Sequence, residues 1–166
     1  KPIDKEESRK RLGLNPGKNI VLFLGNKNLF GKRYDLAVRA LEHLNRGSEK
    51  AILFAGYGNP HSRIPLLMNA SNVLLVTSTW EGSINVVKEA MACNLPIVSV
   101  DVGDVREVIG ETDGCHVCKR DISDISKKLG YSIFFGKTKG RDNISHLNSK
   151  VISEKILEIY KKVISC

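Results

Sequence analysis

Two glutamates separated by seven residues, Glu81 and Glu89, are the first residues of the sequence that suggest a specific chemistry. Gly82 follows the first of them, and the second lies in a run that predicts a helix over 85–93. Backbone N–H groups at the start of a helix are unpaired and bind hydroxyls and anions. Helical side chains lean toward the N-terminus, so Glu89 can face the same ligand. We therefore expect two carboxylates that bracket one small pocket and recognise a polyhydroxylated ligand, because no nucleophile–base pair of the hydrolase kind is evident.

The elements that must position these residues alternate between strands and helices. Continuous apolar runs, most of them closed by glycine or a polar loop, predict strands that are buried on both faces. The predicted strands are 20–24, 51–55, 73–76, 96–100 and, more weakly, 115–118. Apolar residues at helical spacing and polar helix starts predict helices at 6–12, 36–44, 65–70, 85–93, 121–129 and 151–163, with no clear period over 131–148. This alternation predicts an α/β fold with a parallel sheet covered by helices on both faces.

Ligands of such sheets bind at the carboxyl ends of the strands. The loops after Leu24, Ala55, Val76 and Val100 should therefore meet at one edge, and that edge is where we expect the site.

The amino-acid composition limits the classes of protein to which this chain can belong. The 166 residues suit one domain, and 42% hydrophobic with 27% charged residues is typical of a globular chain. A net charge of +8 favours anionic partners such as nucleotide diphosphates, nucleic acid or an acidic membrane surface. An aromatic content of only 6% argues against a stacking platform for single-stranded nucleic acid. No apolar run has the length of a membrane span and no signal segment opens the chain, and Lys1 in place of methionine indicates a processed or excised piece.

Four cysteines include a lone C-x-x-C pair, Cys115 and Cys118, in a short apolar stretch. A zinc site needs about four ligands and a redox pair favours a helix N-terminus, so we expect structural cysteines whose reduced thiols suit the cytoplasm. We expect His61 to be a loop or capping residue, and His116 and His146 to be surface or core residues. Asp104 and Glu107 are expected to orient the start of the next helix and are assigned no chemistry.

The segment from Glu81 to Pro96 closely resembles the signature of glycosyltransferase family 4, a large family of retaining GT-B enzymes. The resemblance rests on the two glutamates, on Gly82 and on the run EAMACNLP. It continues through 22–25 and 32–36, which resemble the family's first strand and phosphate loop, through 98–107, and through 140–160, which resemble its closing helix. It therefore covers nearly the whole chain and implies a Rossmann-like sheet that forms the C-terminal half of a GT-B fold.

The resemblance also implies roles for individual residues. Glu89 corresponds to the residue that holds the ribose hydroxyls, and Glu81 and the amides of 82–85 to groups that contact the donor sugar and phosphate. Lys32 corresponds to the lysine that pairs with the diphosphate and stabilises the charge on the leaving group. Lys32 and Glu81 are thus the catalytic candidates, and no metal or other cofactor is expected. The implied nucleotide-sugar-binding residues are Gly25, Asn26, Lys27, Lys32, Arg33, Ser78, Glu81, Gly82, Ser83, Ile84, Asn85 and Glu89.

The phosphate loop departs from the family's pattern. The family usually has an arginine after the glycine, whereas Asn26 follows Gly25 here, and either Lys27 or Arg33 is a candidate to supply that charge. The position after Lys32 is commonly glycine and is Arg33 here. The stretch 58–72, which usually provides the contacts to the base, is short, so these contacts are not assigned.

The length suits one domain, 1–166, with a lead-in helix and loop at 1–18 and a closing helix at 149–166. A GT-B enzyme has two such domains, so we expect the acceptor-binding N-terminal domain to be missing and the isolated chain to be inactive. The implied activity is retaining transfer of a hexose-type sugar from a UDP- or GDP-sugar to a glycan, lipid or other acceptor in cell-surface polysaccharide or glycoconjugate biosynthesis. The expected location is the cytoplasm, which allows peripheral association of the full-length protein with the inner face of a membrane.

Three other functions remain open at this stage. A non-catalytic nucleotide-binding regulatory domain of GT-B-like fold is favoured by the missing arginine and disfavoured by the two intact glutamates. A GT-B-like epimerase does not usually carry the two glutamates together with the Ala-Cys-x-x-Pro run. A nucleic-acid-binding domain is supported by charge alone, and we expect no nucleic-acid partner.

Overall fold

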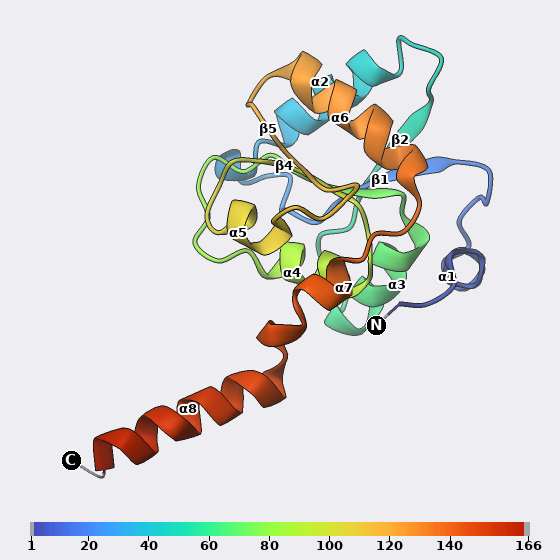
Figure 1. The fold of residues 1–166 in the computed structure, drawn as a ribbon. Coiled ribbons are helices and arrows are strands. Elements are labelled where there is room, and N and C mark those ends of the chain that lie inside the picture. Colours follow the sequence, from blue (N-terminus) through green and yellow to red (C-terminus); the bar gives the residue numbers. More distant parts are fainter. Residues whose placement is uncertain (1, 165–166) are drawn as a thin grey trace.

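Five short parallel strands form the centre of the structure, a computed structural model that describes residues 2–164 (Figure 1). Their order across the sheet is β2-β1-β3-β4-β5. The strands are β1 (Asn19–Phe23), β2 (Ala51–Ala55), β3 (Val73–Val76), β4 (Ile97–Val100) and β5 (His116–Cys118). Every residue of β3 and β4 is buried, which explains why their sequences are continuous rather than alternating in polarity.

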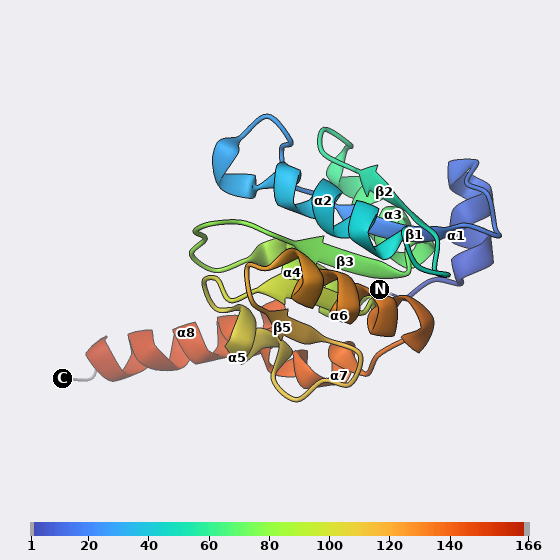
Figure 2. The same cartoon turned by 90° about the horizontal axis from the view of Figure 1, so that it is seen from above.

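Helices cover both faces of this sheet (Figures 1 and 2). On one face lie α2 (Tyr34–Leu44) and α6 (Ile122–Phe135), packed against each other. The other face carries α3 (Ile64–Ala70), α4 (Asn85–Ala92), α5 (Val105–Ile109) and α7 (Gly140–Asn143). Single 3-10 turns are η1 (Phe30–Lys32), η2 (His61–Arg63) and η3 (Ser145–Leu147). The predicted parallel sheet with helices on both faces is therefore confirmed.

The lead-in helix α1 (Lys5–Leu12) packs beside α3 and is tied to the sheet by one buried arginine. The guanidinium of Arg9 donates to the carbonyl oxygens of Ala70 (2.8 Å) and Lys18 (2.9 Å) and to Oδ1 of Asn72 (3.0 Å). Burial lowers the pKa of Arg9. Because these acceptors belong to elements far apart in sequence, the helix is an integral part of the domain.

The stretch 131–148, in which no clear period is evident, is largely helical. Helix α6 continues to Phe135 because Ile133 extends the buried row of Ile125 and Leu129 at helical spacing. Gly130 lies on the same helix opposite Leu44 of α2, where a Cβ would be 3.6 Å from the leucine side chain. The predicted end of this helix at Leu129 is therefore wrong.

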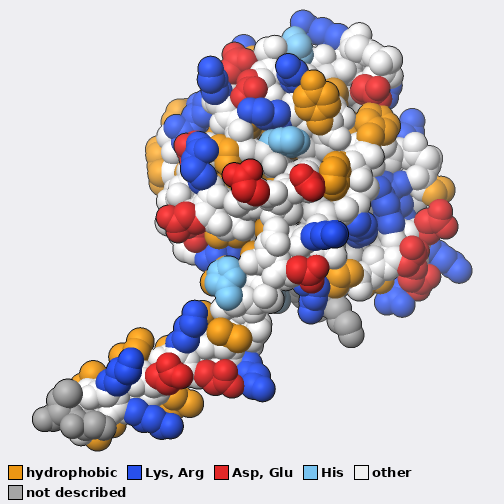
Figure 3. Space-filling model, in the orientation of Figure 1, with side chains coloured by type: hydrophobic (Ala, Val, Ile, Leu, Met, Phe, Trp, Pro, Cys, Tyr) orange, Lys and Arg blue, Asp and Glu red, His pale blue; other side chains and the backbone are white. Residues whose placement is uncertain are grey.

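The last helix, α8 (Ser149–Ile164), extends away from the sheet domain (Figures 1 and 2). No side chain of its described residues is buried, and apolar, basic and acidic side chains all lie along it (Figure 3). The predicted amphipathic helix is confirmed, and the ends of the chain at 1 and 165–166, including Cys166, lie outside the described residues. Among the described helices, none has the length and apolar character to cross a membrane.

Candidate functional site

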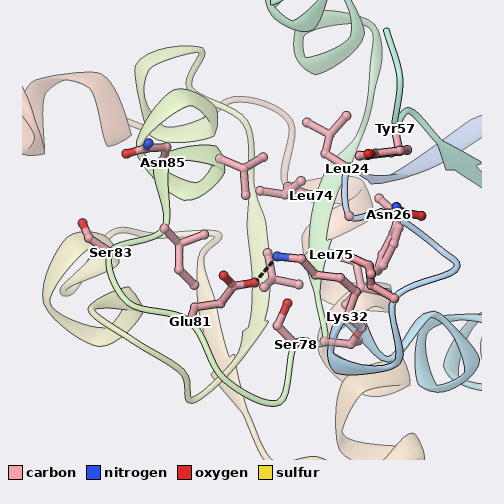
Figure 4. A pocket seen from close by; sticks show the side chains of 17 residues that line it. Leu24, Asn26, Lys32, Tyr57, Leu74, Leu75, Ser78, Glu81, Ser83 and Asn85 are labelled. Atoms are coloured by element: carbon pink, nitrogen blue, oxygen red, sulfur yellow. Dashed lines mark hydrogen bonds and ion pairs between the residues drawn. The ribbon is translucent and has the colours of Figure 1, made fainter.

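A cavity of about 310 Å³ opens at the carboxyl edge of the sheet, between the loops that follow β1 and β3 (Figure 4). The strands of the centre end at this edge, so their following loops converge there, as the sequence predicts. Eight of the predicted site residues line it: Gly25, Asn26, Lys32, Ser78, Glu81, Ser83, Ile84 and Asn85.

The side chains of Lys32 and Glu81 meet inside this cavity (Figure 4). Nζ of Lys32 donates to Oε1 of Glu81, and both side chains are largely buried, with 31% and 20% of their surface exposed. The pair joins the loop after β1 to the loop after β3. A ligand phosphate that approached Lys32 would therefore compete with Glu81 for the same ammonium group.

Two features hold the lysine in place. The hydroxyl of Thr77 lies 2.9 Å from the carbonyl oxygens of both Lys32 and Arg33 and donates to them, which fixes the backbone of the loop. At Gly25 a Cβ would be 3.0 Å from the Phe23 ring and 3.3 Å from Cβ of Lys32, so a glycine here lets the turn η1 lie close to the end of β1.

The start of helix α4 is fixed by a carboxylate from another loop. Asp104 accepts hydrogen bonds from the hydroxyl of Ser83 (2.7 Å) and the backbone N–H of Ile84 (3.0 Å), and its carboxylate lies 3.0 Å from Nζ of Lys88. Partial burial alone would raise the pKa of Asp104, but these hydrogen bonds outweigh it and lower the pKa to about 2. Asp104 thus orients the start of α4, whereas the sequence predicted that it would orient the next helix, α5, to which its side chain makes no capping hydrogen bond.

This capping uses only one of the N–H groups at the helix start. In the described part of the chain, the backbone N–H groups of Ser83, Asn85 and Val86 have no acceptor. Ser83, Asn85 and Val86 all line the cavity. The helix therefore directs unpaired donors and the positive end of its dipole into the space beside Lys32.

Gly103 allows the loop of Glu81 to lie against the loop of Asp104. Its φ of +53° is in the left-handed region, and a Cβ there would be 2.0 Å from the carbonyl oxygen of Gly82. That oxygen accepts a hydrogen bond from the N–H of Asp104 (3.2 Å). Any larger residue at 103 would force the two loops apart and move the helix start.

Replacing Asp104 by alanine is expected to destabilise the chain by about 1–2 kcal/mol, because a capping carboxylate with charge-assisted hydrogen bonds is lost. Denaturant unfolding of D104A and wild type measures this difference, and Glu107→Ala, an exposed position of α5, is the matched control. Since the pKa of Asp104 is lowered to about 2, its contribution should be constant from pH 8 to about 4 and shrink below that as the carboxylate protonates. An unchanged difference at pH 2 would contradict this assignment.

Glu89 lines an adjoining cavity rather than the one that contains Glu81. This second cavity is formed by helix α4 and the loop after β2, and it shares Leu24, Tyr57, Asn85 and Val86 with the first. The two glutamates therefore mark the two ends of one extended groove instead of bracketing a single small pocket. His61, which we expected to be a loop residue, is exposed, and its Nδ1 lies 4.0 Å from Oε1 of Glu89.

The remaining predicted residues lie outside the main cavity. Arg33 pairs with Asp35 (2.9 and 3.0 Å), which raises the pKa of the arginine and lowers that of the aspartate. Lys27 is exposed and does not line the cavity, and Gly82 lines a separate hollow beside Trp80. Among the described residues, Lys32 is therefore the only lysine or arginine that lines the main cavity.

Arg120 supports the site and was missed by the sequence analysis. Its guanidinium donates to the carbonyl oxygens of Ser78 (3.2 Å) and Thr79 (2.6 Å), and so holds the loop after β3 from the side of β5. A lone arginine in a loop carries no sequence signal for such a role, because the contact depends on strands β3 and β5 ending at the same edge.

The C-x-x-C pair lies away from the groove. Burial raises the pKa of the Cys115 thiol to about 11 and that of Cys118 to about 12. No group of three or more candidate metal ligands occurs among the described residues.

Thiols with such pKa values should resist alkylation. At pH 7.5 iodoacetamide should modify the native chain more slowly than the unfolded chain, by about 100-fold at Cys115 and about 1000-fold at Cys118, because the thiolate is the nucleophile. Mass spectrometry of each cysteine peptide measures the two rates. Equal rates in native and unfolded chains would contradict the burial of these thiols.

The family described as "Glycosyl transferases group 1" matches residues 18–132. The chain belongs to this family. Among curated glycosyltransferases, the chain is 31% identical over 139 residues to the lipopolysaccharide core biosynthesis mannosyltransferase LpsB of Rhizobium meliloti (strain 1021), a match covering 65% of this chain and 38% of LpsB. It is 28% identical over 88 residues to the 2-deoxystreptamine N-acetyl-D-glucosaminyltransferase of Streptomyces fradiae, covering 52% of this chain and 21% of that enzyme.

Solved glycosyltransferase structures share the fold. The sucrose-phosphate synthase of Thermosynechococcus elongatus superposes with a TM-score of 0.75 at 19% identity, over 99% of this chain and 49% of that one. HepE of Anabaena, solved in complex with UDP and glucose, gives a TM-score of 0.69 at 16% identity, over 97% of this chain and 52% of HepE. The prediction of half a GT-B fold is thus confirmed, and the chain spans about half the length of these glycosyltransferases or less.

Proposed function

We propose that this chain is the donor-binding half of a retaining glycosyltransferase. It takes a UDP- or GDP-linked hexose and contributes to transfer onto a glycan or lipid acceptor in polysaccharide or glycoconjugate biosynthesis. The observation that carries the proposal is the extended groove at the carboxyl edge, in which Glu89, the N-terminus of α4 and the Lys32–Glu81 pair follow one another.

The order of groups along the groove matches the order of parts in a nucleotide sugar. Glu89 at one end offers a carboxylate to the ribose hydroxyls. The unpaired N–H groups of Asn85 and Val86 lie in the shared middle and suit the diphosphate, with Lys32 beside them. Glu81 at the other end is available for hydroxyls of the sugar once Lys32 turns to the phosphate. The complex of HepE with UDP and glucose supports this class of ligand.

Charge neutralisation in this proposal needs no metal ion. The diphosphate leaving group gains negative charge as the glycosidic bond breaks, and Lys32 with the positive end of α4 stabilises that charge. UDP should therefore bind with the same affinity in excess EDTA and in millimolar Mg²⁺. We include retention of the anomeric configuration in the proposed function because the sequence resembles a family of retaining enzymes.

Calorimetric titration of the chain with UDP, GDP and ADP tests the donor class. We expect one of the first two to bind with micromolar to millimolar affinity, and Glu154→Ala on the exposed helix α8 to leave that affinity unchanged. Absence of binding to all three nucleotides would overturn the proposal. We also expect the isolated chain to transfer no sugar, because a GT-B enzyme forms its active site between two such domains.

A non-catalytic regulatory domain is the alternative, and one observation favours it. Asn26 occupies the place of the usual arginine, so among the described residues Lys32 is the only lysine or arginine that lines the cavity, and it is already paired with Glu81. A regulatory site needs only the nucleotide, whereas a donor site also holds the sugar. Equal affinity for UDP and all UDP-sugars would favour the regulatory function, and selectivity for one UDP-sugar would favour the donor site.

A further inference from the structure

An exposed aromatic surface lies beside the Lys32–Glu81 pair. Phe30 and Trp80 are 82% and 67% exposed, and Leu29 next to them is 54% exposed. They line a hollow together with Gly31, Lys32, Glu81 and Gly82. Leu29, Lys32 and Glu81 also line the main cavity, so a molecule in this hollow would contact the same ion pair as a donor in the groove.

Backbone contacts hold the indole of Trp80 in place. A Cβ at Gly31 would be 2.9 Å from Cζ2 and 3.2 Å from Cε2 of Trp80, so the ring lies directly against the glycine backbone. The neighbouring Thr79 donates its N–H to the carbonyl oxygen of Gly31 (2.8 Å) and accepts from Arg120 (2.6 Å). The ring is thus supported from one side while most of its surface remains open to solvent.

The hollow combines two kinds of surface that one class of ligand requires together. An aromatic face packs well against the C–H groups of a pyranose ring, while the hydroxyls of that ring need polar partners such as the Glu81 carboxylate. An acyl chain would have to remove water from Lys32 and Glu81 without offering them hydrogen bonds, which is unfavourable. The mixed lining therefore favours a saccharide over a lipid tail.

We propose that Trp80 and Phe30 form a stacking platform for a hexopyranose of the acceptor. This inference rests on the proposed function, because it makes the platform adjacent to the donor sugar at Glu81. It gives this half of the enzyme a part in acceptor recognition and a preference for glycan acceptors whose terminal sugar presents an apolar face.

The fluorescence of Trp80, the single tryptophan of the chain, reports on the platform directly. The chain is titrated with methyl α-D-mannopyranoside, methyl α-D-glucopyranoside and glycerol, each with and without saturating UDP. We expect at least one pyranoside to shift the emission with a saturable, millimolar dependence, and glycerol to have no effect. Saturation-transfer NMR should then show about tenfold weaker pyranoside binding to Trp80→Ala and a smaller loss for Phe30→Ala.

The control is Tyr131→Ala, which removes a similarly exposed aromatic side chain from α6. It should leave pyranoside binding unchanged, and Trp80→Ala should leave the UDP affinity within about twofold of wild type. The platform is overturned if neither pyranoside changes the emission of Trp80, or if Trp80→Ala binds the pyranosides as tightly as wild type. UDP binding is measured separately by calorimetry. If pyranosides do not bind but UDP does, the platform is wrong and the proposed donor site is unaffected. If UDP does not bind, the proposed function itself is wrong.

Discussion

Alanine at position 89 is expected to weaken binding of the preferred nucleotide by at least about 30-fold. A carboxylate that accepts from both ribose hydroxyls makes two charge-assisted hydrogen bonds, and losing them costs about 2 kcal/mol or more. Glu89 is suited to this role because it lines the groove from the second turn of α4 while its neighbour Ala90 is buried in the core. Calorimetry with the nucleotide identified for the wild-type chain measures the change.

Three comparisons make the Glu89 result specific. Glu89→Gln, which keeps the shape but not the charge, should lie between wild type and Glu89→Ala. The corresponding 2′-deoxynucleotide should bind wild type more weakly and bind Glu89→Ala about as well as the ribonucleotide. Thermal unfolding of Glu89→Ala should match wild type closely, since the side chain is partly exposed and its close contact is with the exposed His61. A 30-fold loss that appears equally with the 2′-deoxynucleotide would place Glu89 elsewhere on the ligand.

The central part of the fold was predictable because burial on both faces leaves a simple pattern. Strands such as Val73–Val76 have no polar residue, and only a covered parallel sheet accepts such a run. Helix α6 was predicted too short because Gly130 and Ser132 interrupt its apolar pattern, although both face neighbouring parts of the domain. A sequence pattern records the polarity of a residue but not the close packing that makes a small residue favourable at a helix contact.

The spatial placement of the candidate site residues could be predicted where they lie on one continuous segment, and less well where it depends on contacts between loops. Glu81, Asn85 and Glu89 lie on one loop and one helix, so their placement at the groove follows from the strand before them. The roles of Arg120 and Gly103 depend on how the loops after β3, β4 and β5 pack together, which no local pattern encodes. Whether Lys27 or Arg33 supplies the charge of the missing arginine also depends on tertiary structure, and neither residue lines the main cavity.

Lys32→Ala is expected to weaken UDP or GDP binding by at least about tenfold, because it removes the only cation that lines the main cavity among the described residues. The loss should be larger for the diphosphate than for the nucleoside, and it should diminish as salt is raised, since salt screens the attraction that the mutant lacks. Lys27→Ala is the matched control, because Lys27 is an exposed lysine of the same loop and does not line the cavity. Equal losses in both variants would indicate a general effect of positive charge.

Glu81→Gln separates the two partners of the ion pair. In the structure, Lys32 donates to Glu81, so a diphosphate must displace this carboxylate and also meets its negative charge nearby. Removing the charge should therefore strengthen binding of UDP or inorganic pyrophosphate by about threefold to tenfold, whereas binding of the nucleotide sugar should gain less or weaken, because the sugar loses its carboxylate acceptor. Paired calorimetric titrations with UDP and the preferred UDP-sugar measure this divergence. If the variant shifted both affinities equally, Glu81 would act only through Lys32, and its contact with the donor sugar would have to be abandoned.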